Sequence, residues 1–143
     1  MKNAKDVIIS ISGLQGGSNP PDSIEFVTNG KYHFEKDRIR LTYQESELTG
    51  MEGTETSISV TPEGVIMSRE GMMNTRMSFI VGKRDTFLYD TPFGSATMAL
   101  DTYRIQNRLG EHGGSMEIDY VLDLDHVVVG RNKFKINVRE QRI

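Results

Sequence analysis

The sequence predicts an all-β fold: a single antiparallel up-and-down β-barrel of about eight to ten strands, formed by residues 1–143 as one domain. The length of 143 residues is that of one domain with one core. Apolar and polar residues alternate with a period of two along most of the chain, as in strands that face a core on one side and water on the other. Turn-forming residues separate these segments at short spacing, and the resulting number of strands suits a closed or nearly closed barrel.

The alternation is clearest in residues 38–44, 54–60 and 116–125. Each segment is expected to form a half-buried strand, because one set of alternate positions faces a core and the other faces water. The expected inward positions are Ile39, Leu41, Tyr43, Thr56, Ile58, Val60, Met116, Ile118, Tyr120, Leu122 and Leu124. Residues 1–13 are interpreted as a first strand and not as a signal peptide, because their apolar stretch is short and interrupted by serines.

Two segments allow alternatives. Residues 28–31 contain the Asn-Gly pair that favours a tight hairpin turn, but the flanking segments could also form one strand kinked at Gly30. Residues 95–109 alternate in their first half and also carry apolar residues at helical spacing, and a long strand is favoured over a helix. Residues 13–23 are the most loop-like stretch and are expected to connect the first two strands. Further turns are expected at residues 35–37, 61–64, 70–74, 81–85, 91–94 and 109–114.

The composition excludes several classes of protein. Hydrophobic residues make up 36% of the chain and charged residues 26%, and no apolar run reaches the roughly 20 residues of a membrane helix, so a soluble protein is expected. The absence of cysteine excludes disulfides, thiolate metal sites and cysteine nucleophiles, and it agrees with a cytoplasmic location. The net charge of −3 argues against a general nucleic-acid-binding protein, which needs a basic face.

A basic stretch near the C-terminus is expected to be the solvated outer face of a final strand. Long basic side chains commonly cover exposed strands. In a strand, one face would carry Arg131, Lys133 and Lys135, and the opposite face Phe134, Ile136 and Val138.

No metal site and no cofactor are expected. The histidines His33, His112 and His126 are isolated in the sequence, without a second ligand at short range. The glycine-rich stretches at residues 13–18 and 110–115 lack the helix and the lysine-serine pair of a phosphate-binding loop, so they are interpreted as turns.

Polar residues continue several of the inward faces. An unpaired buried charge costs several kcal/mol, so Glu45 and Arg69 are expected to pair with each other, to reach solvent at strand ends, or to contact a ligand. Phe93, at the tip of the turn at residues 91–94, is the candidate plug of a barrel mouth. The candidate ligand-binding residues of the lumen are Tyr43, Glu45, Arg69, Tyr89, Thr91, Thr102 and Tyr120.

The residues leave three functions open. The main hypothesis is a non-enzymatic barrel that binds a small amphipathic molecule in its lumen, since ligand pockets are mostly apolar with a few polar groups. The alternative is a structural or protein-interaction barrel with a filled core, for which a second copy of the chain is one candidate partner. The third is an enzyme in which Glu45 acts as acid or base and Arg69 holds an anionic substrate. No catalytic residue is assigned.

Four motifs carry a family resemblance. They are YQE at residues 43–45, REG at 69–71 followed by MSFIVG at 77–82, YDTPFG at 89–94, and GGSMEIDYVLDL at 113–124. In their order and spacing over residues 7–138 they resemble the YwiB-like family of small, uncharacterised bacterial proteins. The resemblance implies a calycin-like, that is lipocalin-like, antiparallel β-barrel in the cytoplasm of a bacterium of the Gram-positive type. It implies no activity and no catalytic residue, because none is defined for the family.

Overall fold

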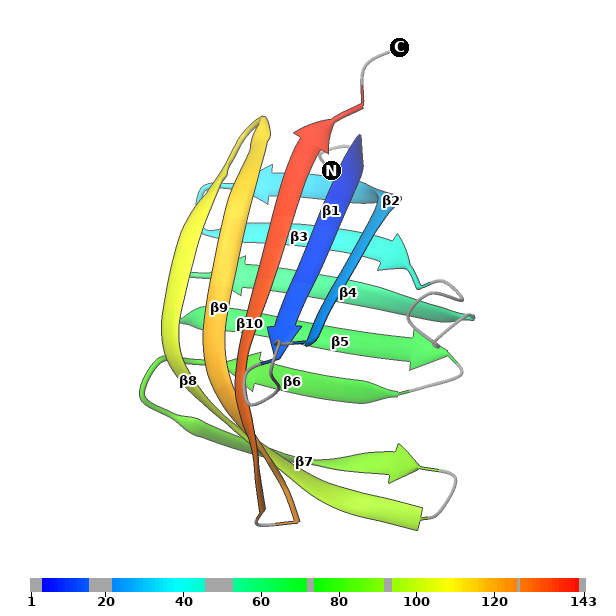
Figure 1. Ribbon diagram of the computed structural model, residues 1–143. Coiled ribbons are helices and arrows are strands. Elements are labelled where there is room, and N and C mark those ends of the chain that lie inside the picture. Colours follow the sequence, from blue (N-terminus) through cyan, green and yellow to red (C-terminus); the bar gives the residue numbers. More distant parts are fainter. Residues whose placement is uncertain are drawn as a thin grey trace.

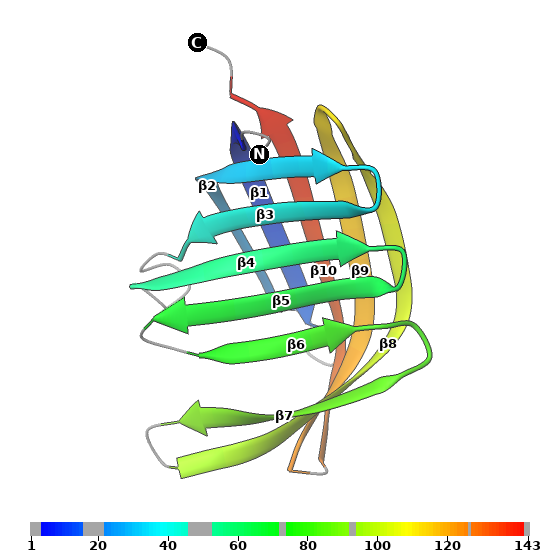
Figure 2. The ribbon, with the colours of Figure 1, turned by 180° about the vertical axis from the view of Figure 1, so that it is seen from behind.

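Ten strands form one antiparallel sheet that curls into a nearly closed barrel in the computed structural model, which confirms the predicted all-β class (Figures 1 and 2). The structure describes residues 4–15, 22–45, 53–71, 74–91, 94–125 and 127–141, with residues 14, 15, 22–24, 89–91, 128 and 129 described by their backbone. The strands are β1 (Lys5–Gln15), β2 (Asp22–Glu35), β3 (Arg38–Gln44), β4 (Thr54–Thr61), β5 (Gly64–Gly71), β6 (Thr75–Phe79), β7 (Arg84–Thr91), β8 (Gly94–Gly110), β9 (Gly113–Leu124) and β10 (Val127–Glu140).

The strand order is that of an up-and-down barrel. Across the sheet the order is β6-β5-β4-β3-β2-β1-β10-β9-β8-β7, so every pair is consecutive along the chain except β1 with β10. The pairing of β1 with β10 runs from Val7 opposite Glu140 to Gln15 opposite Asn132. The two edges of the sheet, β6 and β7, are also consecutive, and they lie side by side where the barrel would close (Figure 2).

Strand β2 turns the corner between the two walls of the barrel (Figure 1). Its first part pairs with β1, and its last part, from Gly30 onward, pairs with β3. A Cβ atom on Gly30 would lie 2.3 Å from Cδ1 of Ile9 and 2.5 Å from the carbonyl oxygen of Thr42, so the corner requires a residue without a side chain. The hairpin prediction for residues 28–31 is therefore wrong, and the alternative of one strand kinked at Gly30 is confirmed.

Strand β8 is a single strand of 17 residues. This confirms the prediction of a long strand rather than a helix, and the strand contains a bulge. The register with β9 shifts between Thr102 and Arg104, which leaves Tyr103 as the extra residue with 57% of its surface exposed. Beyond a bulge the inward positions change parity. Leu100 and Thr102 are buried before it, and Ile105 packs against the core after it. This change of parity explains why the segment resembles both a strand and a helix in sequence.

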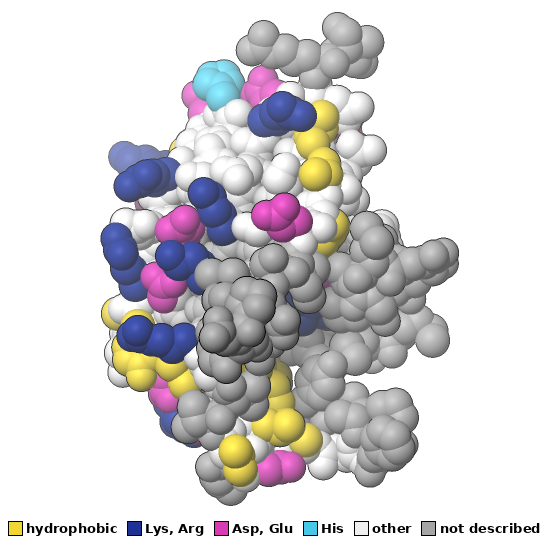
Figure 3. Space-filling model, in the orientation of Figure 1, with side chains coloured by type: hydrophobic (Ala, Val, Ile, Leu, Met, Phe, Trp, Pro, Cys, Tyr) yellow, Lys and Arg dark blue, Asp and Glu magenta, His cyan; other side chains and the backbone are white. Residues whose placement is uncertain are grey.

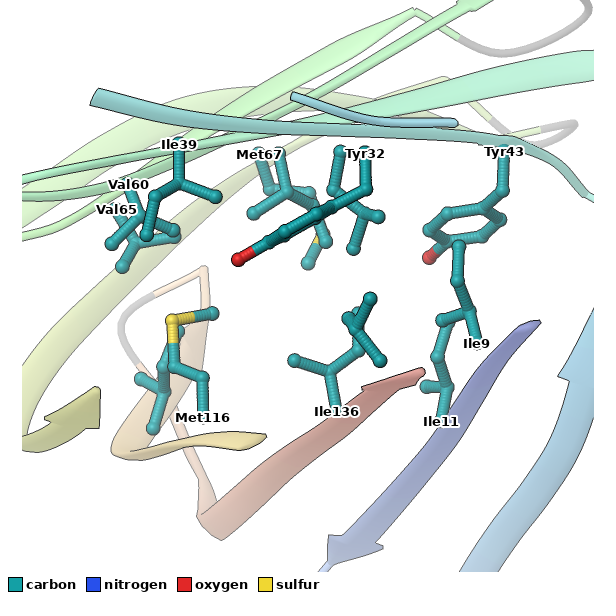
Figure 4. Close-up of a cluster of buried hydrophobic side chains, with 14 of the residues drawn as sticks. Ile9, Ile11, Tyr32, Ile39, Tyr43, Val60, Val65, Met67, Met116 and Ile136 are labelled. Atoms are coloured by element: carbon teal, nitrogen blue, oxygen red, sulfur yellow. The ribbon is translucent and has the colours of Figure 1, made fainter. Parts of the chain in front are cut away.

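Hydrophobic side chains from opposite walls fill much of the interior (Figure 4). The Tyr32 ring lies between the two walls, and its hydroxyl donates a hydrogen bond of 2.6 Å to the carbonyl oxygen of Gly110. Burial raises the pKa of Tyr32 to about 12. The predicted inward residues of β3 and β4, and Met116 and Ile118 of β9, are buried. Leu124 is a correction: it is 40% exposed because it is the last residue of β9, beyond the core.

The basic face of β10 is the solvated outer face that the sequence predicts. Ile136 and Val138 are buried on the opposite side, and Phe134 packs against the core. Lys133 lies 3.9 Å from Asp119 and Lys135 lies 3.7 Å from Glu117, both on β9. Basic and acidic side chains are interspersed on this side of the molecule (Figure 3).

The first expected loop is shorter than predicted. Strand β1 continues to Gln15 and β2 begins at Asp22, so parts of residues 13–23 belong to strands. Strands β7 and β8 end and begin at Thr91 and Gly94, which agrees with a hairpin at residues 91–94, while Phe93 lies outside the described residues.

Substituting Gly30 tests the corner of β2. We expect Gly30→Ala to lower the free energy of unfolding by about 1–3 kcal/mol, because the added methyl group overlaps Ile9 and the Thr42 carbonyl. Gly13→Ala is the matched control in β1, where an added Cβ meets no atom within 4 Å. Urea denaturation measures both variants. Equal stability of the two would contradict the close approach at Gly30.

The contact between the first and last strands makes stability depend on pH. Lys5 lies 2.8 Å and His112 3.1 Å from Oε1 of Glu140, and these hydrogen bonds lower the pKa of the Glu140 carboxyl to about 2. A lowered folded-state pKa stabilises the protein above the ordinary pKa of about 4.3, and this contribution is lost as the pH falls toward 2.

We therefore expect Glu140→Gln to lower the urea midpoint at pH 6, with a difference from the native protein that shrinks below about pH 4.5 and disappears near pH 2. Glu63→Gln, in the exposed turn between β4 and β5, is the control. A difference that does not change with pH would show that Glu140 acts without its charge.

Candidate functional site

Polar side chains gather inside one end of the barrel, where β3 and β5 end and β4 and β6 begin. The pairing of the strands aligns Tyr43 with Thr56, Thr56 with Arg69, and Arg69 with Thr75 in one row across four strands. The backbone N–H of Glu45 donates a 2.8 Å hydrogen bond to the carbonyl of Thr54, which begins the next row. We call this group the polar cluster; its members are Tyr43, Glu45, Thr54, Thr56, Arg69 and Thr75.

The same alternation that builds the core also builds the polar cluster. Tyr43 has the parity of Ile39 and Leu41, and Arg69 has the parity of Val65 and Met67. Threonine is compatible with this position because its β-branched side chain favours strands while its hydroxyl remains available for hydrogen bonding. Each strand therefore changes from hydrophobic to polar along its inward face, and Tyr43 lies at the end of the hydrophobic cluster in Figure 4.

Glu45 and Arg69 form an internal ion pair. Nε of Arg69 lies 3.7 Å from Oε2 of Glu45, with 1% of the Glu45 side chain and 19% of the Arg69 side chain exposed. Oε2 of Glu45 also accepts a hydrogen bond from the Thr56 hydroxyl. The distance to Arg69 is too long for a hydrogen bond, so the two charges attract each other without satisfying each other's hydrogen-bonding groups.

Five buried side-chain polar atoms have no hydrogen-bond partner among the described residues. They are Glu45 Oε1, Thr54 Oγ1, Arg69 Nε, Thr75 Oγ1 and Thr102 Oγ1. A buried polar group without a partner costs about 1–3 kcal/mol, and native proteins contain few of them. Four of the five belong to the polar cluster, which can therefore accept hydrogen bonds from, and donate them to, a bound molecule.

Tyr120 of the opposite wall faces the polar cluster. Burial raises the pKa of the Tyr120 hydroxyl, while the charge of Arg69 acts in the opposite direction, so the tyrosine on β9 is within electrostatic reach of Arg69 on β5. Tyr120 contacts the edge of the Phe79 ring at a centroid distance of 5.2 Å. Thr102 on β8 pairs with Tyr120 and is buried. The backbone carbonyl of Thr102 accepts a 3.1 Å hydrogen bond from Gly82, beyond the end of β6, so of these two residues Tyr120 is the one that reaches toward the polar cluster.

Tyr43 and Tyr120 are neutral hydrogen-bonding groups at neutral pH. Burial, with a further contribution from the Glu45 carboxylate, raises the pKa of the Tyr43 hydroxyl above its ordinary value. Since both phenols have raised pKa values, neither ionises near pH 7. The phenol groups can act as donors or acceptors without adding charge.

An open groove on the surface borders the polar cluster. It has a volume of about 740 Å³ and is lined by residues of β5, β6 and β7, among them Arg69, Thr75 and Phe87. The groove lies at the seam, our name for the junction between the sheet edges β6 (Thr75–Phe79) and β7 (Arg84–Thr91). At the seam the backbone N–H of Ser78 donates a 2.8 Å hydrogen bond to the Asp85 carboxylate.

The structure brings together most of the described candidate residues. Tyr43, Glu45 and Arg69 lie in the polar cluster, and Thr102 and Tyr120 lie on the wall opposite. Tyr89 and Thr91 belong to β7, where the structure describes their backbone and not their side chains. Phe93 lies outside the described residues. Sequence reasoning omitted Thr54, Thr56 and Thr75 as site residues, although each has the inward parity of its strand and Thr56 was expected to face inward.

The histidines have partners that the sequence spacing did not indicate. His33 lies 2.9 Å from Glu35, two residues along β2, and His112 lies 3.1 Å from Glu140 of the last strand. His126 lies outside the described residues. Within the part of the chain that the structure describes, no three potential ligands gather as a metal site, and no helix is suited to crossing a membrane.

Removing one member of the ion pair tests whether Glu45 depends on Arg69. We expect Arg69→Met to lower the free energy of unfolding at pH 7 by about 3 kcal/mol, because the Glu45 charge stays buried without its partner. The double variant Glu45→Gln/Arg69→Met is expected to recover most of this loss. Arg76→Met, on the exposed face of β6, is the control. An equal loss in the single and double variants would contradict the coupling.

Comparison with known proteins agrees with the fold. Residues 9–136 match the family described as "Domain of unknown function (DUF1934)". The chain is 25% identical over 120 residues to the "Uncharacterized beta-barrel protein YwiB" of Bacillus subtilis (strain 168), an alignment that covers 84% of this chain and 83% of that protein. The crystal structure of the ywiB protein from Bacillus subtilis superposes with a TM-score of 0.80 at 20% identity, over 99% of this chain and 96% of that one. The resemblance seen in the four sequence motifs is thereby confirmed, and the chain belongs to the DUF1934 family.

Proposed function

We propose that this protein binds one small amphipathic molecule inside the barrel, with the polar part of the molecule at the polar cluster. The observation that carries the proposal is the set of four buried polar atoms in the polar cluster without a hydrogen-bond partner among the described residues. A ligand that supplies those partners would remove the cost of leaving them unsatisfied. Barrels of this size commonly have room for one small ligand.

The environment of the polar cluster supports the proposal. Ligand sites are mostly apolar, with a few polar groups that fix the orientation of the bound molecule. Here the apolar part is the hydrophobic interior that begins beside Tyr43, and the groove at the seam supplies a route to Arg69 and Thr75. Because the sequence has no cysteine, a cytoplasmic location is part of this proposal.

The alternative is a structural or interaction protein with a filled barrel. One observation favours it: the Tyr32 ring and its neighbours fill the interior at the hydrophobic end (Figure 4). Under this alternative the edge strands would be the contact surface, and β7 carries Leu88 with 67% of its surface exposed. The enzymatic alternative depends on the same Glu45 and Arg69 side chains, and no further observation favours it.

Binding is tested with the fluorescent probe N-phenyl-1-naphthylamine. We expect saturable binding with one site per chain, and displacement of the probe by decan-1-ol, because both molecules join an apolar body to one polar group. Thr54→Val removes a buried hydroxyl that has no hydrogen-bond partner within the described part of the chain. This variant is expected to weaken decan-1-ol binding about fivefold while raising the urea midpoint of the ligand-free protein.

Thr86→Val is the matched control, since Thr86 is exposed on β7. It should change neither the affinity nor the urea midpoint appreciably. A linear, non-saturating fluorescence response to the probe, together with a strictly filled interior, would favour the interaction alternative.

A further inference from the structure

The polar cluster presents an acceptor and a donor of opposite charge at the same place. Oε1 of Glu45 is a buried acceptor, and Nε of Arg69 is a buried donor, and neither has a hydrogen-bond partner among the described residues. The two side chains approach to 3.7 Å through the other oxygen of Glu45. A molecule that satisfies both groups must offer one donor and one acceptor within a short distance of each other.

The charges of the cluster cancel. On the described inward faces of β3 to β6 at this end of the barrel, the charged side chains are Glu45 and Arg69, and the others are threonines and Tyr43. A carboxylate ligand would meet Arg69 but would also be placed beside the buried Glu45 charge. A cationic ligand would meet the converse difficulty with Arg69. Either ion would lose its hydration for a site without net charge, which is unfavourable.

We propose that the head group of the ligand is neutral and carries both a hydrogen-bond donor and an acceptor, as a hydroxyl or a primary amide does. This inference rests on the proposed function. A hydroxyl or amide can donate to Glu45 Oε1 and accept from Arg69 Nε without disturbing the ion pair. The Thr54 and Thr75 hydroxyls, which can both donate and accept, fit the same kind of head group.

The inference is tested with four ligands that share a ten-carbon chain: decan-1-ol, decanamide, decanoate and decylammonium. Dissociation constants are measured at pH 7 by displacement of N-phenyl-1-naphthylamine. In the native protein, decan-1-ol and decanamide are expected to bind at least about tenfold more tightly than either ion. Each ion would interact favourably with one of the two charged side chains, Glu45 or Arg69, and would be repelled by the other, whereas a neutral head group can hydrogen-bond to both.

Changing the charge of the cluster should change the preferred head group. Glu45→Gln leaves Arg69 as the charged member of the pair, so decanoate is expected to gain about tenfold relative to decan-1-ol. Arg69→Gln leaves Glu45, so decylammonium is expected to gain by a similar factor. The controls are Glu55→Gln and Arg40→Gln, whose side chains are exposed on β4 and β3. Both controls should keep the native order of affinities.

The outcomes separate the two proposals. Saturable binding in which decanoate or decylammonium is the tightest ligand of the native protein, or in which all four bind equally, overturns the neutral head group and leaves a binding protein. No saturable binding of any of the four overturns both. If Arg69→Gln does not fold, the gain or absence of gain for decanoate in Glu45→Gln decides the inference alone.

Discussion

The barrel depends on the antiparallel pairing of its first strand with its last. Without the contact between β1 and β10, the strands form two separate meanders, β1 to β6 and β7 to β10, each with a hydrophobic face open to water. With it, β1 lies between β2 and β10, and its residues Val7 and Ile9 become fully buried. Hydrophobic burial is the largest favourable term in folding, so the interior can form as one core when this pairing is made.

Around that core the molecule is divided along the length of its strands. The same inward parity carries isoleucine, leucine and methionine at one end and threonine, glutamate and arginine at the other. The hydrophobic end is packed around Tyr32 and supplies stability. The polar end contains the ion pair of Glu45 with Arg69, and hydroxyl groups that have no hydrogen-bond partner among the residues the structure describes. Proteins that bind ligands commonly accept such local costs at the site, where the bound molecule offsets them.

Much of this organisation could be predicted from the sequence, because the period-two pattern is local. Parity alone predicts the buried residues Ile39, Leu41 and Ile58, the outward basic residues of β10, and the inward Glu45 and Arg69.

The features that parity could not predict depend on contacts between distant segments. Gly30 bends a strand because Ile9 and Thr42 approach it, and nothing in its own neighbourhood distinguishes a kink from a hairpin. The bulge at Tyr103 likewise reverses parity within one strand, and the pairing of Glu140 with His112 joins residues from different hairpins. The inward position of Thr75 could also have been predicted from parity, since Thr75 precedes Met77 by two residues on the same strand.

The seam gives the barrel a mechanical property that its other junctions lack. Each of the nine strand pairs of the sheet is a ladder of backbone hydrogen bonds, and separating any of them would break several bonds together. Among the described residues, β6 and β7 instead meet through contacts such as the hydrogen bond from the Ser78 backbone N–H to the Asp85 carboxylate. Widening the wall at the seam would therefore break fewer backbone hydrogen bonds than separating any of the nine strand pairs.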